Sequence, residues 1–139
     1  MHYLDASCCV AALTPESGTL RTGAWLADQS EGDLAISPWV HAEVASALSI
    51  KVRTASLTVD ERSAVLAGWL ALRQGLVSLS ITEEIFSLAA DMAGRHELAL
   101  RAGDALHLAI AATHGCTLVT LDDRMAKAAE KLGVPVAAI

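Results

Sequence analysis

Leu98 to Ala112 read Leu-Ala-Leu-Arg-Ala-Gly-Asp-Ala-Leu-His-Leu-Ala-Ile-Ala-Ala, and this stretch decides the fold. Seven of the eight residues from Ala105 onward are apolar, which is typical of a helix buried on every side. The only acid is Asp104, and the Ala-Gly pair before it indicates a loop that enters the helix. We therefore expect Asp104 in the first helical turn, where free N–H groups and the helix dipole favour negative charge. This places a carboxylate at the mouth of the protein interior.

Three other acids stand where a hydrophobic segment gives way to a polar one. Asp5 follows the short apolar opening 2–4, Glu43 lies in the apolar segment 39–45, and Asp122 follows the apolar segment 117–121. A single acid at a helix start is usually only a partner of the helix dipole. Four acids in equivalent places indicate a shared site, provided that the fold brings them together.

Length and composition predict one globular domain, residues 1–139. The chain is 53% hydrophobic and 19% charged, which suits a compact core and excludes a disordered tail. The formal net charge of -6 argues against a broad basic face that grips nucleic acid through many phosphates. A polyanionic substrate would therefore need a local device, and a divalent cation held by acids is the obvious one.

The cysteines and the apolar segments indicate a cytoplasmic protein without a membrane span. Cys8, Cys9 and Cys116 are odd in number and lack Cys-x-x-Cys spacing, so we expect small buried hydrophobes in a reducing compartment. The opening residues do not have the pattern of a signal peptide. The uncharged stretch 105–121 is too short to cross a bilayer and is broken by His114-Gly115, so it predicts a helix followed by a strand.

Hydrophobic periodicity and turn residues predict alternating strands and helices. Ser37-Pro38 marks a helix start, and Thr58 to Glu61 form a capping box. The expected strands are residues up to Leu4, Leu34–Ile36, Leu76–Ile81, Cys116–Leu121 and Val134–Ile139. The expected helices are Ser7–Leu13, Thr19–Gln29, Ser37 to about Arg53, Thr58 to near Gly75, Thr82–Glu97, the central helix from Asp104, and Asp123–Leu132, with turns at 14–18 and 30–33.

This alternation predicts an α/β fold, a three-layer α/β/α sandwich with a mainly parallel sheet of about five short strands. Ligands of such sheets bind beyond the carboxyl ends of the strands. Asp5 and Asp122 each follow a strand, while Glu43 and Asp104 lie in the first two turns of helices that start near the same edge. All four acids can therefore converge there.

The chemistry expected of four carboxylates is metal-assisted hydrolysis. Close carboxylates repel one another unless a cation compensates, and oxygen ligands favour Mg²⁺ or Mn²⁺. Such an ion activates water and stabilises charge on a phosphate, so in-line cleavage of a phosphodiester is expected. Ser7 and Thr120, each two residues from an acid, are candidates for orienting it. His107 is more simply a hydrogen-bonded core histidine than a general base. The candidate substrate contacts are Arg101, Arg124 and Lys127.

Four segments together resemble the acidic blocks of PIN domains, especially VapC-type toxins. They are Tyr3-Leu4-Asp5-Ala6-Ser7, Ala42-Glu43-Val44, Gly103-Asp104-Ala105-Leu106-His107-Leu108-Ala109 and Leu118-Val119-Thr120-Leu121-Asp122. The resemblance covers essentially the whole chain, with the blocks in the family's order. It implies a magnesium-dependent ribonuclease, commonly a homodimer, that a small antitoxin neutralises by filling the acidic cleft with its tail. It also implies that the four acids ligate the metal and that Ser7 and Thr120 support them.

Several alternatives stay open on sequence alone. Asp123 directly follows Asp122, so either residue can be the fourth acid, although the Thr120-x-Asp122 spacing favours Asp122. The chain could instead be a nuclease acting on another nucleic acid, a phosphoacceptor receiver domain, or a catalytically silent binding module with the same fold. Trp39 and Trp69 are expected to be exposed, which together with the high apolar fraction points to a homodimer.

Overall fold

Four short parallel strands form the sheet at the centre of the computed structural model, which describes residues 1–16, 18–30 and 32–139. The strands are β1 (His2–Leu4), β2 (Leu34–Ile36), β3 (Val77–Ser78) and β4 (Thr117–Val119), in the order β3-β2-β1-β4. The register pairs Tyr3 with Ala35 on one side and with Leu118 on the other. Because β1 is central, the residues that follow it leave the sheet in the middle of its carboxyl edge.

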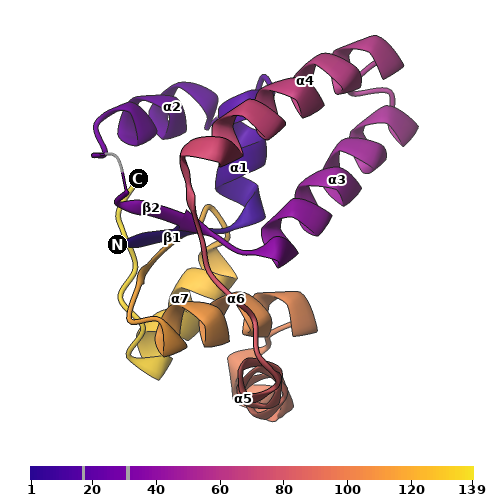
Figure 1. Cartoon of the computed structure of the whole chain (residues 1–139). Helices are drawn as coiled ribbons and strands as arrows, with labels where there is room; N and C mark the ends of the chain where they lie inside the picture. Colours follow the sequence, from indigo (N-terminus) through magenta and orange to yellow (C-terminus); the bar gives the residue numbers. More distant parts are fainter. Residues whose placement is uncertain (17, 31) are drawn as a thin grey trace.

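Helices cover both faces of this sheet, which confirms the expected three-layer α/β/α architecture. Figure 1 shows α1 to α4 on one face, with α3 and α4 as a hairpin, and α5, α6 and α7 on the other. The helices are α1 (Ala6–Leu13), α2 (Thr19–Ala27), α3 (Pro38–Arg53), α4 (Val59–Leu72), α5 (Glu83–Gly94), α6 (Ala102–Thr113) and α7 (Asp123–Leu132), with 3-10 turns η1 (Arg73–Gly75) and η2 (His96–Leu98).

The expected fifth strand at residues 134–139 does not form as a strand. Only one parallel bridge joins Leu118 to Val136, made by the Leu118 N–H to the Pro135 carbonyl and the Ala137 N–H to the Leu118 carbonyl. Extending this ladder backward would require Pro135 to donate a hydrogen bond, and proline has no N–H. The segment therefore runs beside β4 without adding a full strand to the sheet.

Local signals predicted most helix boundaries. Thr58 and Glu61 form the expected reciprocal capping box, and α7 ends at Gly133, whose φ of 72° is left-handed. Three helices end earlier than expected: α2 at Ala27 rather than Gln29, α4 before η1 and α5 before η2. Ser17 and Glu31, which belong to two expected turns, lie outside the described residues.

The core lies on both faces of the sheet. On one side it is formed by α6, whose residues 105–111 are all buried, and on the other by side chains such as Val44 and Leu48 of α3. Asp104 stands half-buried in the first turn of α6, at the edge of this core as predicted. Trp69 is 0% exposed and packs inside, so the expectation that it lies on the surface was wrong, while Trp39 is half-buried. Among the described residues, no helix is both long and apolar enough to cross a bilayer.

Candidate active site

Asp5 is the best-anchored acid of the candidate site. It leaves β1 at the carboxyl edge of the sheet and caps α1, and its side chain is only 3% exposed. Its Oδ1 accepts hydrogen bonds from the Ser7 hydroxyl at 2.6 Å and the Cys8 N–H at 3.1 Å, and its Oδ2 accepts one from the Thr120 hydroxyl at 2.7 Å. A carboxylate that accepts three hydrogen bonds has a fixed orientation.

The two hydroxyls that hold Asp5 also bind the segment after β4. The Leu121 N–H donates to Ser7 Oγ and the Asp122 N–H donates to Thr120 Oγ1, both at 3.0 Å. Asp122 is the N-cap of α7, as expected, and its Oδ1 accepts from the N–H groups of the second and third helical residues. Ser7 and Thr120 therefore connect Asp5 to Asp122, although β4 ends at Val119 and not at Leu121.

Glu43 belongs to a second hydrogen-bonded group. Its Oε2 lies 2.5 Å from His107 Nε2, and His107 Nδ1 lies 3.0 Å from the Tyr3 hydroxyl, which in turn lies 2.8 Å from the Ser37 hydroxyl. His107 is therefore the hydrogen-bonded core histidine that was expected. Ser37 precedes α3 as predicted, but its side chain makes no capping bond because it faces Tyr3 instead.

Asp104 and Gly103 bring the start of α6 toward Glu43. Asp104 Oδ2 accepts a hydrogen bond from the Arg101 N–H, and no described residue donates to Oδ1. A Cβ at Gly103 would lie 3.2 Å from Glu43 Oε1 and 3.7 Å from the Trp39 indole nitrogen, so glycine gives the carboxylate room. Asp104 and His107 are three residues apart on α6 and share a face, so Glu43 packs against the face that carries Asp104.

A cavity of about 580 Å³ is lined by one member of each hydrogen-bonded group. Ser7 and Glu43 both line it, with apolar side chains of α1 and α3 between them. In residues 1–16, 18–30 and 32–139, no three Asp, Glu, His or Cys side chains are close enough to hold one ion. Each of the four acids is instead bonded to a protein donor.

Burial governs the other ionisable groups around Asp5 and Glu43. Desolvation raises the pKa of Tyr3 well above its usual range, and the nearby charges of Glu43 and Asp5 raise it further, against a lowering by the Ser37 hydrogen bond. Desolvation, followed by the charge of Asp5, likewise raises the pKa of the Cys8 thiol. Tyr3 therefore stays a phenol, and Cys8 stays a thiol rather than a thiolate ligand.

The residues present fit a hard divalent cation. Within the described residues, Asp104 Oδ1, Asp122 Oδ2 and Glu43 Oε1 accept no protein hydrogen bond, and Asp5 Oδ2 accepts one. Oxygen donors without a thiolate suit Mg²⁺ or Mn²⁺ better than Zn²⁺. The space left beside Glu43 by the missing side chain of Gly103 is consistent with the same conclusion.

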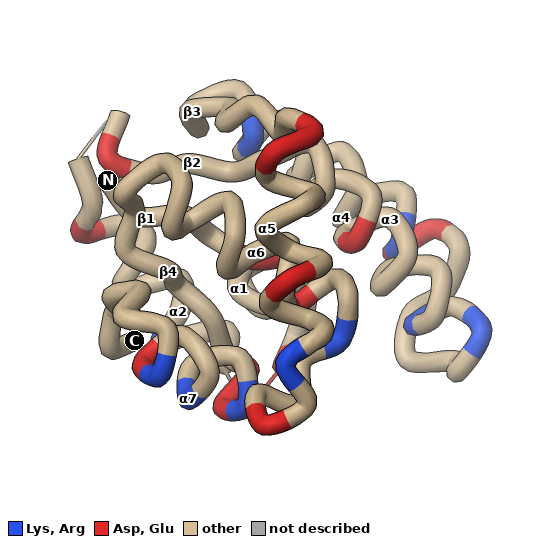
Figure 2. The backbone as a smooth tube through the Cα atoms, turned by 90° about the horizontal axis from the view of Figure 1, so that it is seen from below, with Lys and Arg blue, Asp and Glu red and all other residues tan. Residues whose placement is uncertain are grey.

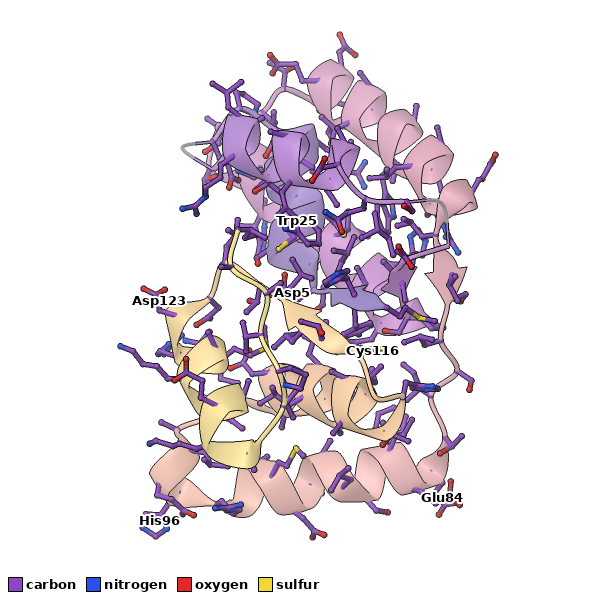
Figure 3. All side chains as sticks on the ribbon, turned by 90° about the vertical axis from the view of Figure 1, so that its left-hand side faces the viewer. Asp5, Trp25, Glu84, His96, Cys116 and Asp123 are labelled. Carbon is purple, nitrogen blue, oxygen red and sulfur yellow. The ribbon has the colours of Figure 1, made fainter. Side chains whose placement is uncertain are left out.

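The remaining site residues that the sequence suggested are exposed on the surface. Asp123 is exposed, and Figure 3 shows it at the outer edge of the molecule, whereas Asp5 lies in the interior. Arg101, Arg124 and Lys127 are exposed as well. Figure 2 shows basic positions in α7 and in the segment that joins α5 to α6, interspersed with acidic ones.

Sequence reasoning missed the partners of Glu43. Tyr3, Ser37 and Gly103 were assigned to a strand, a helix cap and a loop. Gly103 lies against Glu43, Tyr3 binds the histidine that holds Glu43, and Ser37 binds Tyr3. One signal was available: Tyr3 and Asp5 are two residues apart at the end of a strand and so lie on the same side of it. Nothing local to residue 43 indicated His107, which is 64 residues away.

Comparison with known proteins identifies the class that this fold and site define. A model of the PIN domain matches residues 2–131, which is nearly the whole chain. The chain therefore belongs to the PIN domain family. No curated protein matches the sequence.

Solved structures with similar folds come from several bacteria. FitAcB from Neisseria gonorrhoeae has a TM-score of 0.71 at 22% identity, covering 99% of this chain and 97% of that chain. VapC20 from Mycobacterium tuberculosis, described as a toxin that cleaves the sarcin-ricin loop, has a TM-score of 0.74 at 17% identity, with 92% and 95% coverage. VapBC2 from Rickettsia felis, bound to a DNA fragment of its promoter, has a TM-score of 0.63 at 18% identity, with 98% and 96% coverage. At these identities the likeness concerns the fold.

Proposed function

We propose that this protein is a magnesium-dependent endoribonuclease and the toxin of a toxin-antitoxin pair. PIN domains are generally nucleases. The observation that carries the proposal is the fixed Asp5 carboxylate at the carboxyl edge of the sheet, held by Thr120 and by Ser7, which lines a cavity together with Glu43. This is the edge at which parallel α/β sheets bind ligands.

In this proposal four acids hold the metal: Asp5, Glu43, Asp104 and Asp122. A bound Mg²⁺ or Mn²⁺ supplies an activated water and stabilises negative charge on the phosphate. Ser7 and Thr120 keep Asp5 in place by donating to its two oxygens, so its orientation does not depend on the ion. No protein nucleophile is needed, which agrees with thiols that burial keeps protonated.

The proposed substrate is RNA, and the proposed partners are a cognate antitoxin and a second copy of the chain. A chain of net charge -6 needs local cations at the site, and the exposed side chains of Arg101, Arg124 and Lys127 are the candidates. The toxin VapC20 and the VapBC2 complex have the same fold, which supports the toxin assignment. The cavity beside Glu43, with its apolar lining, is where we place the tail of the antitoxin.

The direct test is RNA cleavage by the purified chain. We expect cleavage with millimolar Mg²⁺ or Mn²⁺ and none after chelation, because the ion supplies both the nucleophile and the charge compensation. Expression without an antitoxin should arrest growth, and Asp104→Ala should remove the arrest. A single-stranded DNA of matching sequence is the substrate control. Growth arrest that persists in Asp104→Ala would show that the acids are not the mechanism.

The fourth acid can be identified by a matched pair of variants. Asp122→Asn should slow cleavage at least about tenfold, equivalent to roughly 1.4 kcal/mol in the barrier, because it removes a proposed ligand carboxylate while the backbone bond from residue 122 to Thr120 is kept. Asp123→Asn should stay within a few-fold of wild type, because Asp123 is exposed and turned about a third of a turn away along the helix. Rates measured at saturating metal in the reverse order would make Asp123 the ligand.

A further inference from the structure

A buried row of hydrogen bonds ends on one oxygen of Glu43. It runs from Ser37 after β2, through Tyr3 in β1 and His107 in α6, to Glu43 in α3, with distances of 2.8, 3.0 and 2.5 Å. Ser37 is 1% exposed, Tyr3 0% and His107 2%. Three side chains excluded from water thus form a hydrogen-bonded chain whose last member, His107, binds a carboxylate that lines the cavity.

The hydrogens of this row can be assigned in one consistent way. Burial raises the pKa of Tyr3, so its hydroxyl keeps its hydrogen and can donate it to His107 Nδ1. The Ser37 hydroxyl then donates to the Tyr3 oxygen, and the remaining imidazole hydrogen lies on Nε2, directed at Glu43 Oε2. In this assignment each donor is used once and His107 donates from Nε2 to Glu43.

We propose that His107, held by Tyr3 and Ser37, is a positioning residue that binds Glu43 Oε2 and thereby presents Oε1 to the metal. The inference rests on the proposed function, because it assigns Glu43 a metal. His107 does not touch the ion or the substrate. It acts through Glu43, as a hydrogen-bond donor behind a metal ligand orients that ligand.

The surroundings of Glu43 Oε1 support this division between the two oxygens. Gly103 lies against Oε1 and has no side chain there, so the atom is not covered by the first turn of α6. The indole nitrogen of Trp39, near the same place, is buried without a hydrogen-bond partner in the described structure. No hydrogen bond from a described residue reaches Oε1, whereas Oε2 is bound by the shortest contact of the row.

A second histidine provides an internal comparison. The Trp69 indole N–H donates to His41 Nδ1 at 2.8 Å, which is also a bond between a buried aromatic side chain and a histidine on a neighbouring helix. Among the described residues, neither member of this pair forms a hydrogen bond or ion pair with an acid. Trp69→Phe therefore removes a similar hydrogen bond from the same fold without altering the support of Glu43.

The experiment compares two amide replacements of His107 by their affinity for Mn²⁺, followed in the full chain by loss of the free-ion EPR signal. Glutamine places its amide nitrogen near the position of Nε2 and can still donate to Glu43, whereas asparagine places its nitrogen near Nδ1 and reaches only toward Tyr3. We expect His107→Gln to bind Mn²⁺ within about threefold of wild type. We expect His107→Asn and His107→Leu to bind at least about tenfold more weakly.

This order separates positioning from a purely structural role. If His107 served only to fill and stabilise the core, the metal affinities of the Gln and Asn variants would be equal, and the inference would be overturned. Equal affinity of His107→Leu and wild type would overturn it as well. If His107→Leu does not fold, the Gln and Asn pair decides the question, with Trp69→Phe expected to lose stability but keep wild-type Mn²⁺ affinity.

Asp104→Asn distinguishes failure of the inference from failure of the proposed function. It should weaken Mn²⁺ binding whatever the role of His107, because Asp104 is a proposed ligand. Weak binding in Asp104→Asn together with wild-type binding in His107→Asn would overturn only the positioning role. Wild-type binding in Asp104→Asn would overturn the shared metal site, and the inference with it.

Discussion

Asp5→Ala is expected to abolish metal-dependent cleavage and to lower the free energy of unfolding by about 2–3 kcal/mol at the same time. The Asp5 carboxylate accepts from Ser7, Cys8 and Thr120, and the alanine variant leaves all three donors without this partner. The hydroxyls can turn to other acceptors, but the Cys8 N–H is fixed by the backbone at the start of α1. Loss of this buried bond carries most of the expected cost.

Asp104→Asn should abolish cleavage without the loss of stability. An asparagine at this position can still accept from the Arg101 N–H through its side-chain oxygen, so the local hydrogen bond survives. Removing the charge weakens the interaction with the helix dipole and also relieves repulsion among the acids, two effects of opposite sign. The free energy of unfolding of the metal-free variant should therefore lie within about 1 kcal/mol of the wild-type value.

Three measurements test the expectations for Asp5→Ala and Asp104→Asn. Urea unfolding of the metal-free proteins gives the stability difference, and RNA cleavage at saturating Mg²⁺ should fall at least about a hundredfold in both variants, roughly 2.7 kcal/mol in the barrier. Mg²⁺ should raise the melting temperature of wild type and have no effect on Asp104→Asn, because an ion bound only by the folded state stabilises it. An Asp5→Ala variant as stable as wild type would show that the three hydrogen bonds do not hold the sheet edge together.

The part of the site that could be predicted from the sequence consists of acids positioned by local structure. Asp104 follows an Ala-Gly pair and precedes a fully apolar run, so its place in the first turn of a buried helix follows from nearby residues alone. Asp122 was identified in the same way, as the N-cap of α7 two residues after Thr120. Parallel strand order then places both near the carboxyl edge of the sheet.

The environment of Glu43 could not be predicted, because it depends on contacts between distant segments. Ser37 before Pro38 is a strong capping signal, yet in the fold its hydroxyl forms a hydrogen bond with the Tyr3 hydroxyl across the β1–β2 pair. Tyr3 and His107 are 104 residues apart and meet only when β1 and α6 pack together. A pattern along the chain reports which residues share a strand or a helix face, and it does not report which faces meet.

The same limit explains the wrong prediction for Trp69. Its helix, α4, is apolar from Ala64 to Leu72, and such a run does not report which of its side chains face the core; the indole is covered completely and donates to His41. The missing fifth strand is a local failure of a different kind. Val134 to Ile139 alternate well enough for a strand, but Pro135 lacks the hydrogen-bond donor that a longer ladder needs.

Trp69→Ala is expected to lower the free energy of unfolding by about 3–5 kcal/mol, because it removes the largest fully buried side chain and leaves a cavity together with an unpaired His41 nitrogen. Phe86→Ala is the contrasting variant. Phe86 is 55% exposed on α5 and lines an apolar groove with Trp39 and Leu106, so its loss should change monomer stability by less than about 0.5 kcal/mol.

The pair also tests where the proposed homodimer forms. With Trp69 inside the core, the exposed aromatic surface left for a second copy is the groove around Phe86, and burying such a side chain in an interface commonly contributes more than about 1 kcal/mol. Light scattering should therefore give a dimer for wild type at micromolar concentration and a shift toward monomer for Phe86→Ala. A dimer of unchanged affinity in Phe86→Ala would place the interface elsewhere. A monomeric wild type would remove the dimer from the proposal. Neither result would alter the expected instability of Trp69→Ala.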